Sequence, residues 1–396
     1  MPDSFDPTAP LPSAPDPWAD SEIPSHRAGP PYHMTDMISA EPHLARRLLG
    51  RLLQSGSPAA DLAAAIAAAS GAGHPIVFAG CGTSEHASIA AAEIVRDALQ
   101  RTGATRPGNV LALEGFEASL QPLGRGVVIG VSHEGGTAAT RATMAAARAG
   151  GARTAAITAG SASPAAKLAD IVLATGEMDQ SYCHTIGYVS PLLAVTAVAA
   201  HLTRAPIDAE TVAGLLEAGI QEIAAEVIAG ELGDASHLII IASGADRPAA
   251  RELAIKIEEA SWLPTTMRDL ETFLHGHVPA TDESTGLVLI QADRDHRDER
   301  VTRARQALAS AGVVGLRRAA ILSEDAARAI PDQLTPAGRI VVREAPDLPS
   351  PIAALFASAT PLQLITERVA RARGTNPDPI RRDDARYREA ASVSGT

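Results

Sequence analysis

Apolar residues along this chain fall into short continuous runs and longer stretches with helical spacing. Aliphatic runs that end near a glycine predict buried strands, and the periodic stretches predict helices with one apolar face. In the first half, strands are expected at residues 75–80, 126–132, 152–160 and 169–176. Helices are expected at residues 61–70, 84–100, 137–150 and about 187–202. This alternation predicts an α/β fold with buried parallel strands.

The second half of the chain repeats the pattern. Residues 237–261 can be aligned with residues 74–98 so that strand, glycine turn and helix coincide. We therefore predict that the chain is internally duplicated. Further strands and a closing helix are expected at residues 286–292, 313–322, 339–344 and 361–374.

The two ends of the chain differ from the rest. Residues 1–31 are rich in proline and poor in aliphatic residues, which predicts a disordered leader. The helical spacing of residues 34–54 is interrupted at Glu41 and Pro42. Polar residues and helix breakers past Gly374 predict a tail that can lie across a neighbouring surface. The expected domains are residues 32–215 and 216–373, followed by the tail at 374–396.

Length, charge and cysteine content narrow the class of protein. A chain of 396 residues suits two domains of about 150 residues each. Its net charge of −12 and the lack of a basic cluster argue against nucleic acid as a ligand. Neither an unbroken apolar run of about 18 residues nor a signal-like start is found, so membrane insertion and secretion are not expected. Cys81 and Cys183 are the only cysteines, which predicts free thiols in a reducing cytoplasm.

Two glycine-containing turns join predicted strands to predicted helices. The first is Gly80–Ser84 and the second is Ser132–Thr137. Glycine lets a ligand approach the backbone, and the unpaired N–H groups at a helix start attract an anion. Either turn alone could simply cap its helix. Because the carboxyl ends of parallel strands meet at one edge of a sheet, the pair predicts an anion-binding site at that edge.

A candidate acid/base set lies in the second half. Lys256 and Glu259 are three residues apart, on one face of the predicted helix, and Glu252 lies one turn earlier. The simple alternative is a solvated row of ion pairs. Further along, His275 and His277 flank a glycine. No metal site is expected there, since no cysteine is near and the nearby carboxylates lack the spacing of zinc ligands. His277 is assigned an ordinary hydrogen-bonded position.

The segments GCGTSEHA, VSHEGGTAAT and KIEEAS, the last followed by HG, resemble the tandem sugar isomerase (SIS) domain family over roughly residues 37–380. This family includes the isomerase half of glucosamine-6-phosphate synthase and stand-alone phosphosugar isomerases and deaminases. The resemblance implies two SIS domains, each a flavodoxin-like parallel sheet flanked by helices. It also implies a sugar phosphate ligand and no cofactor. The implied ligand contacts are the backbone groups of Cys81 and Gly82 and the side chains of Thr83, Ser84, Ser132 and Thr137. His133 replaces the family's glutamine; it could donate a hydrogen bond to the anion, and the alternative is that it only packs beside the turn.

The resemblance also implies catalytic roles. Glu259 would be the base that moves a proton between C1 and C2 of the sugar, and Lys256 would stabilise the charge of the enediolate. The family's ring-opening histidine lies sixteen residues after its glutamate, and this position is His275. An imidazole titrates near neutral pH, so it can both donate and accept the proton. In the family a neighbouring subunit supplies this histidine, which implies a homodimer with a shared active site.

The chain departs from the family pattern at three places. Glu134 stands where the family has a phosphate-binding serine, so either its carboxylate turns outward or the ligand differs, for example by carrying an amine. No lysine follows Lys256, which excludes an imine formed by a lysine of the tail. Within residues 176–190, Glu177 matches the family, while the residues that differ are Tyr182, His184 and Thr185. We predict a metal-free phosphosugar isomerase or amino-sugar-phosphate isomerase/deaminase; the alternative is a sugar-phosphate sensor without catalysis.

Overall fold

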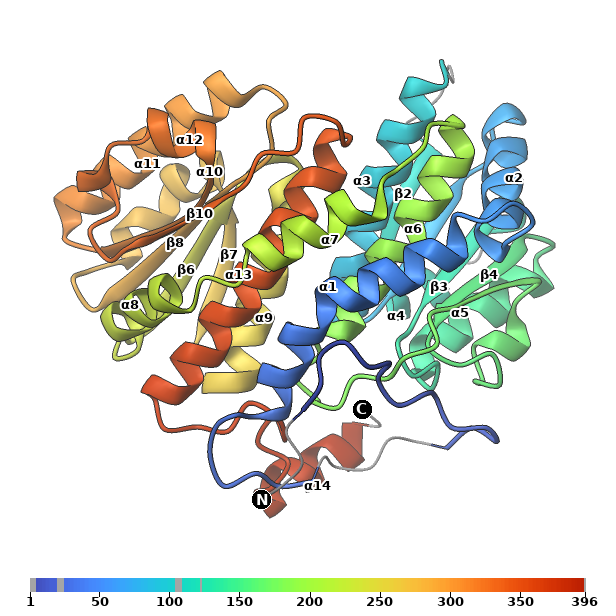
Figure 1. The fold of residues 1–396 in the computed structure, drawn as a ribbon, viewed down its shortest axis with the longest axis horizontal. Helices are drawn as coiled ribbons and strands as arrows, with labels where there is room; N and C mark the ends of the chain where they lie inside the picture. Colours follow the sequence, from blue (N-terminus) through green and yellow to red (C-terminus); the bar gives the residue numbers. More distant parts are fainter. Residues whose placement is uncertain (1–4, 20–24, 104–108, 122, 395–396) are drawn as a thin grey trace.

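The computed structural model describes residues 5–19, 25–103, 109–121 and 123–394. It contains two five-stranded sheets, one from each half of the chain, with helices packed around them (Figure 1). The strand pairs within each sheet are parallel. The predicted fold class, two flavodoxin-like parallel sheets flanked by helices, is therefore confirmed.

The first sheet has the strand order β2-β1-β3-β4-β5. Its strands are β1 (Ile76–Gly80), β2 (Val110–Glu114), β3 (Val127–Val131), β4 (Arg153–Thr158) and β5 (Ile171–Ala174). The adjacent central strands β1 and β3 are fully buried, because aliphatic side chains on both faces are covered by helices. They end side by side, so the two glycine turns that follow them lie at the same edge.

The second sheet has the order β10-β9-β8-β6-β7, which is the same topology when its strands are counted from β6. Its strands are β6 (His237–Ala242), β7 (Thr265–Asp269), β8 (Thr285–Gln291), β9 (Arg317–Ser323) and β10 (Arg339–Val342). The shared strand order is what an internal duplication would produce, and the duplication itself stays a prediction, as do the domain limits.

Several long helices lie between the two sheets and join them into one core (Figure 1). These are α1 (His33–Leu52), α7 (Ala209–Ala218), α9 (Arg247–Ser261) and α13 (Ser350–Ala372). Helix α3 (Thr83–Arg101), which follows the first glycine turn, contacts α9, which follows the equivalent turn of the second sheet. The elements that carry the predicted site residues therefore meet at the junction of the two halves.

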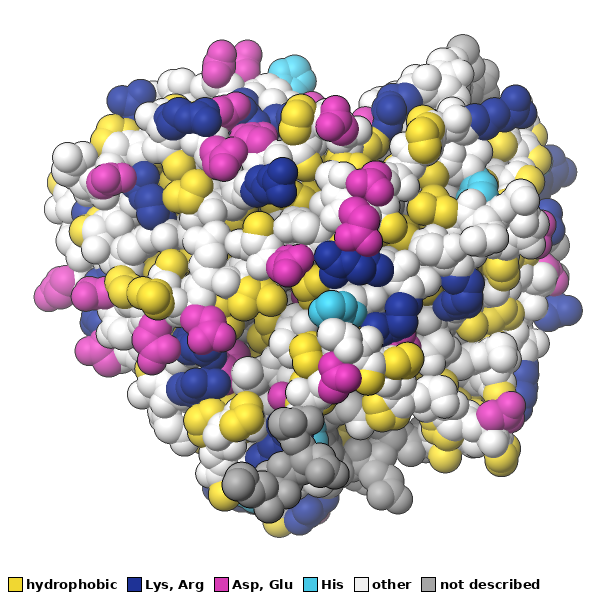
Figure 2. Space-filling view, viewed as in Figure 1, with side chains coloured by type: hydrophobic (Ala, Val, Ile, Leu, Met, Phe, Trp, Pro, Cys, Tyr) yellow, Lys and Arg dark blue, Asp and Glu magenta, His cyan; other side chains and the backbone are white. Residues whose placement is uncertain are grey.

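The remaining helices pack around this core or lie in the connections between strands, and α14 lies in the C-terminal tail. They are α2 (Pro58–Gly71), α4 (Gly115–Leu120), α5 (Ala138–Ala149), α6 (Ile186–Thr203), α8 (Glu222–Leu232), α10 (Leu270–Thr272), α11 (Arg297–Val314), α12 (Glu324–Ala329) and α14 (Ala385–Ser394). Among the described residues, α6 is the one helix long and apolar enough to cross a membrane, and 83% of it is buried inside the molecule. On the face seen in Figure 2, acidic and basic side chains are interspersed.

Helix α1 differs from the sequence-based expectation, because it runs without a break through Glu41 and Pro42. Both side chains are buried, and α1 packs against α6, α7 and α13. Tertiary packing thus outweighs the local cost of proline within a helix. Burial raises the pKa of Glu41 well above its usual value, which favours the neutral acid in this position.

The described part of the leader, residues 5–19 and 25–31, contacts the rest of the chain. Leu11 is buried against the first half of the chain, and Trp18 donates a hydrogen bond to the backbone of Glu134. A few apolar anchors among the prolines explain why this composition still adopts one position. The rest of the leader, residues 1–4 and 20–24, lies outside the described residues.

The C-terminal tail packs on the chain's own surface. Its Asp378 carboxylate accepts hydrogen bonds from the backbone N–H groups of His33 and Met34, at 2.8 and 2.9 Å. It therefore satisfies unpaired donors at the start of α1. Further on in the tail, the guanidinium carbon of Arg382 lies 4.9 Å from the ring centroid of Tyr182. Tyr182 belongs to the loop that follows β5.

Candidate active site

The centre of the candidate site is a buried ammonium group that joins the two halves of the chain. Lys256 on α9 donates hydrogen bonds to Thr83 Oγ1 at 2.8 Å and to Glu259 Oε2 at 2.6 Å. Thr83 is the first residue of α3, directly after the glycine turn of the first sheet. A side chain of the earlier turn and a carboxylate of the later helix thus share one cation.

A second carboxylate, that of Glu252, also belongs to this cluster. Glu252 Oε1 accepts a hydrogen bond from Thr83 Oγ1 at 3.2 Å and lies 3.5 Å from Lys256 Nζ. Its other oxygen is 2.9 Å from His86 Nδ1. Glu252 and Lys256 are both fully buried, so the alternative of a solvated row of ion pairs is wrong for this pair.

Charge compensation fixes the protonation of the cluster. Burial by itself would lower the pKa of Lys256, but the carboxylates of Glu259 and Glu252 outweigh it and raise that pKa above its usual value. Burial would likewise raise the pKa of Glu252, but the Lys256 ammonium and the hydrogen bonds from His86 and Thr83 lower it instead. Lys256 therefore stays charged and Glu252 stays ionised near neutral pH.

Exposure separates the roles within the cluster. The Lys256 side chain is 1% exposed, while that of Glu259 is 23% exposed. Glu259 is thus the member that a small molecule can reach. A carboxylate held by one fixed ammonium and open on its other side is suited to accept and return a proton.

The backbone of the first turn is tightly packed and depends on its glycines. Gly82 has φ 56°, a conformation that favours glycine, and a Cβ on Gly80 would lie 2.5 Å from the carbonyl oxygen of Ser84. The Cys81 thiol points to Glu114, at 3.4 Å from Oε1, so the turn itself presents only the backbone of Cys81. Burial and the neighbouring Glu114 raise the pKa of this thiol, which favours its neutral form.

The second turn is held by its own hydroxyl groups. Ser132 Oγ lies 3.2 Å from Thr137 Oγ1 and accepts a hydrogen bond from the N–H of Gly135 at 3.1 Å. Gly135 has φ 77° and packs directly on Ser163, which leaves no room for a side chain. Thr137 is exposed and Ser132 is buried, so Thr137 is the more accessible of the two predicted ligands.

The His133 side chain packs against the loop that follows β5. Its Nε2 accepts the N–H of Asp179 at 2.9 Å, and its ring meets that of His184 edge-on, with centroids 5.2 Å apart. Burial lowers the pKa of His133 to about 4, so the ring is neutral at pH 7. This geometry favours the packing alternative for His133 over the predicted role as an anion ligand.

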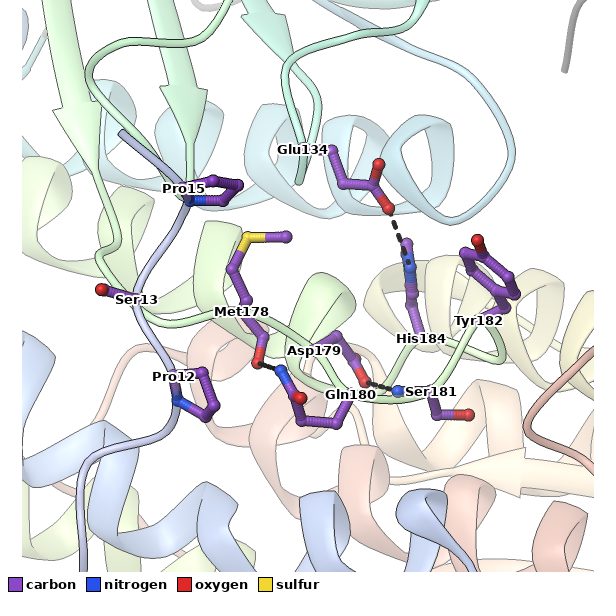
Figure 3. A pocket seen from close by; sticks show the side chains of 10 residues that line it. All are labelled: Pro12, Ser13, Pro15, Glu134, Met178, Asp179, Gln180, Ser181, Tyr182 and His184. Atoms are coloured by element: carbon purple, nitrogen blue, oxygen red, sulfur yellow. Dashed lines mark hydrogen bonds and ion pairs between the residues drawn. The ribbon is translucent and has the colours of Figure 1, made fainter. Parts of the chain in front are cut away.

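Glu134 lines a cavity of about 210 Å³ beside the second turn (Figure 3). Its Oε1 lies 3.9 Å from His184 Nε2, across the cavity, so the carboxylate faces inward and not into bulk water. Burial lowers the pKa of His184 well below its usual value. Of the two alternatives for Glu134, an outward-turned side chain is thus the one that the structure contradicts.

The loop that follows β5 forms the floor of this cavity. Asp179 accepts hydrogen bonds from the backbone N–H groups of Ser181, Thr185 and Gly187, at 3.0, 2.7 and 3.1 Å. Burial nevertheless raises the pKa of Asp179 to about 6. The aspartate therefore fixes the loop's shape, which brings Gln180 and His184 to the cavity wall.

His275 lies away from the cluster within one chain. Its side chain is 71% exposed, and its Nε2 is 2.6 Å from Glu271 Oε1. His277 accepts a hydrogen bond from Arg268 Nε at 3.3 Å, in agreement with the ordinary role assigned to it. Over the described ranges, no group of three or more histidine, cysteine, aspartate or glutamate side chains is arranged to hold a metal ion.

Sequence reasoning missed the contributions of His86 and Asp179, and it considered Glu252 only as part of a solvated row of ion pairs. A signal existed for His86, which lies one helical turn after Thr83 and so on the same face of α3. For Asp179, position alone gave no sign that three backbone groups converge on it.

Comparisons with known proteins agree with this architecture. Residues 70–201 match the family model of the SIS domain. Over 324 residues, the chain is 28% identical to glutamine--fructose-6-phosphate aminotransferase [isomerizing] of Gloeobacter violaceus, covering 77% of this chain and 50% of that protein. The chain thus spans about half the length of this curated relative.

Two solved structures share the fold across both halves. The C-terminal domain of glucosamine-fructose-6-phosphate aminotransferase from Francisella tularensis superposes with a TM-score of 0.74 at 17% identity, covering 89% of this chain and 99% of that one. The tagatose-6-phosphate ketose/aldose isomerase from Escherichia coli gives a TM-score of 0.66 at 17% identity, with coverage of 90% and 97%. At such low identity these likenesses show the fold.

Proposed function

We propose that this chain is a phosphosugar isomerase that interconverts an aldose and a ketose, or their amino-sugar equivalents, by moving a proton between C1 and C2. The observation that carries the proposal is the buried Lys256 ammonium, hydrogen-bonded to both Thr83 of the first turn and Glu259 of the second half. Such a link sets a base beside an anion-binding turn in one small site. The names of the related proteins support the substrate class, since they refer to fructose-6-phosphate and tagatose-6-phosphate.

In the proposed reaction, Glu259 takes the proton from C2 of the open-chain aldose. The C–H electron pair forms the C1–C2 double bond, and the C1 carbonyl oxygen becomes an enediolate oxygen, which takes the proton of the C2 hydroxyl group. Glu259 returns its proton to C1 to give the ketose. Lys256 is too deeply buried to touch the sugar, so it acts by positioning Glu259 and Thr83 and by its positive charge. No metal or cofactor takes part.

Substrate binding in this proposal uses the two glycine turns. Ser84 and Thr137 carry the accessible hydroxyl groups, and Cys81 and Gly82 of the first turn contribute their backbone groups. Ring opening requires an imidazole, which we assign to His275 of a second copy of the chain, because His275 is exposed and does not contact Glu259 within its own chain. The active form is then a homodimer.

Proton exchange tests the proposal directly. Fructose-6-phosphate, glucose-6-phosphate, glucosamine-6-phosphate and tagatose-6-phosphate are incubated with the protein in heavy water, and deuterium at C1 and C2 is followed by NMR. We expect exchange with at least one of them, reduced at least about 100-fold in Glu259→Gln. Glu258→Gln, an exposed neighbour on the same helix, is the matched control and retains the wild-type rate. Equal rates in wild type and Glu259→Gln would contradict the proposed mechanism.

A sugar-phosphate sensor is the second candidate, and one observation favours it. The Glu134 carboxylate faces the cavity beside a turn that would otherwise be suited to a phosphate. A sensor would be thermally stabilised by a sugar phosphate in which no proton is ever exchanged. The same panel of compounds, measured by thermal shift beside the exchange experiment, separates the two candidates.

A further inference from the structure

Residues 11–18 form an extended segment, here called the strap, that runs along the cavity beside the second turn. Its first anchor is the segment after β5. Leu11 donates its N–H to Glu177 Oε2 at 2.8 Å, and Pro12 accepts the N–H of Met178 at 2.8 Å. Ser13 pairs with Glu177 as an isolated antiparallel bridge. The strap thus adds a short stretch of strand pairing to the edge of the cavity.

Glu177 is itself held rigidly. Arg47 on α1 donates to both of its carboxylate oxygens, at 2.8 and 2.7 Å, and a further Arg47 nitrogen donates to the carbonyl of Thr8. Paired hydrogen bonds between guanidinium and carboxylate are strong and directional. The Glu177 carboxylate therefore connects the strap to helix α1.

The second anchor lies on the glycine turn. The indole N–H of Trp18 donates to the carbonyl oxygen of Glu134 at 2.9 Å. Between the anchors, Pro12, Ser13 and Pro15 line the cavity, opposite the loop that carries His184 (Figure 3). Ala14 packs so closely on Gly160 that a Cβ added to Gly160 would lie 2.7 Å from the Ala14 Cβ.

We propose that the cavity beside the second turn is the part of the substrate site that receives the sugar, and that the strap, as one wall of this cavity, sets the size of the sugar that the enzyme accepts. This inference rests on the proposed function. Proline residues restrict the backbone before any ligand arrives, so the wall loses little conformational freedom on binding. The anchors are few, however, so small changes at Trp18 or Gly160 are enough to move it.

Two substitutions outside the cavity lining displace the strap in different ways. Gly160→Leu pushes Ala14 away, and Trp18→Phe keeps an aromatic ring but removes the indole N–H. Gly230→Leu is the control for a new leucine, because nothing lies within 4 Å of its Cβ position. We expect KM for the preferred substrate to rise about tenfold in both strap variants, with kcat changed less than about threefold. Bulkier analogues, such as the N-acetylated amino-sugar phosphate, gain turnover relative to the preferred substrate.

A readout independent of turnover uses the strap's own tryptophan. The chain has two tryptophans, Trp18 and Trp262. In a Trp262→Phe background, Trp18 emission is recorded while each sugar phosphate of the panel is added. We expect a saturable change that is lost or shifted to at least about tenfold higher ligand concentration when Gly160→Leu is added.

The outcomes distinguish the strap from the isomerase function. Unchanged KM and unchanged size preference in both strap variants overturn the strap proposal, while exchange that still depends on Glu259 leaves the isomerase intact. A Trp18 response that depends on Gly160, without any proton exchange, supports the strap and overturns the isomerase. If no sugar phosphate of the panel gives proton exchange or a Trp18 response, both proposals are overturned.

Discussion

Replacing Lys256 by methionine is expected to lower the free energy of unfolding by about 3–5 kcal/mol and to reduce proton exchange at least about 100-fold. The reason is the fully buried Glu252, which loses its ammonium partner and keeps only the hydrogen bonds from Thr83 and His86. Glu259 also loses the donor that orients it. Urea unfolding and deuterium exchange at C2 measure the two effects.

The chain offers a matched control and a rescue for this variant. Lys167 is the other lysine of the sequence and is exposed, so Lys167→Met should leave both quantities unchanged. Adding Glu252→Gln to Lys256→Met removes the uncompensated charge and should recover part of the stability without the activity. A fully stable Lys256→Met single variant would show that the cluster does not contribute to folding.

The pH dependence of Lys256→Met has a definite sign. Without the ammonium, we expect burial to outweigh the hydrogen bonds from His86 and Thr83 and to raise the pKa of Glu252 in the folded state above its unfolded value. A group with a raised folded pKa binds a proton more readily when folded, so the stability deficit of this variant shrinks as the pH falls through that pKa. The wild type shows the opposite contribution, because its Glu252 has a lowered pKa and loses stabilisation as the pH falls.

Sequence patterns predicted the central strands of both sheets and missed one strand in each. The missed strands, β2 and β7, are both edge strands next to the first strand of their sheet. Each has only its first residue fully buried, and β7 reads TTMRD. An edge strand needs no continuous aliphatic run, so the signal that reveals a central strand is absent in β7. In β2 a short run, VLAL, is present, but only its first residue is fully buried.

The boundary of α11 shows a related limit. Val313 and Val314 are expected in a strand because they precede an aliphatic run, yet they end the helix, and β9 begins only at Arg317. Gly315, with φ 93°, separates the two elements. Local composition does not say on which side of such a glycine a pair of valines will lie.

Within the site, spacing predicted neighbours on one helix and could not predict burial. Lys256 and Glu259 are neighbours because they are three residues apart, and the structure agrees. Whether Glu252 faces solvent or protein depends on α3, which comes from the other half of the chain. The strap was also beyond prediction, since its prolines gave no apolar pattern and its position depends on single contacts at Leu11 and Trp18.

Mixing two inactive variants should restore activity, and this is the sharpest test of where His275 acts. We expect Glu259→Gln and His275→Ala each to lose at least about 100-fold in isomerase activity when prepared alone. If a second copy supplies the histidine, a mixed dimer has one intact site, formed by Glu259 of one chain and His275 of the other. Equal mixing makes half of the dimers mixed, each with one of two sites intact, so activity recovers to about one quarter of wild type.

The alternatives give different results in the same experiment. A histidine that served its own chain would leave every site of the mixed dimer defective, and mixing would restore nothing. A histidine with no part in the reaction would leave His275→Ala fully active on its own. The His275 side chain is exposed and forms an ion pair with Glu271, which does not direct the imidazole to the buried Lys256 cluster. This position argues against a catalytic role of His275 in the site of its own chain. His277→Ala, two residues away, is the matched control and should neither lose activity nor need a partner.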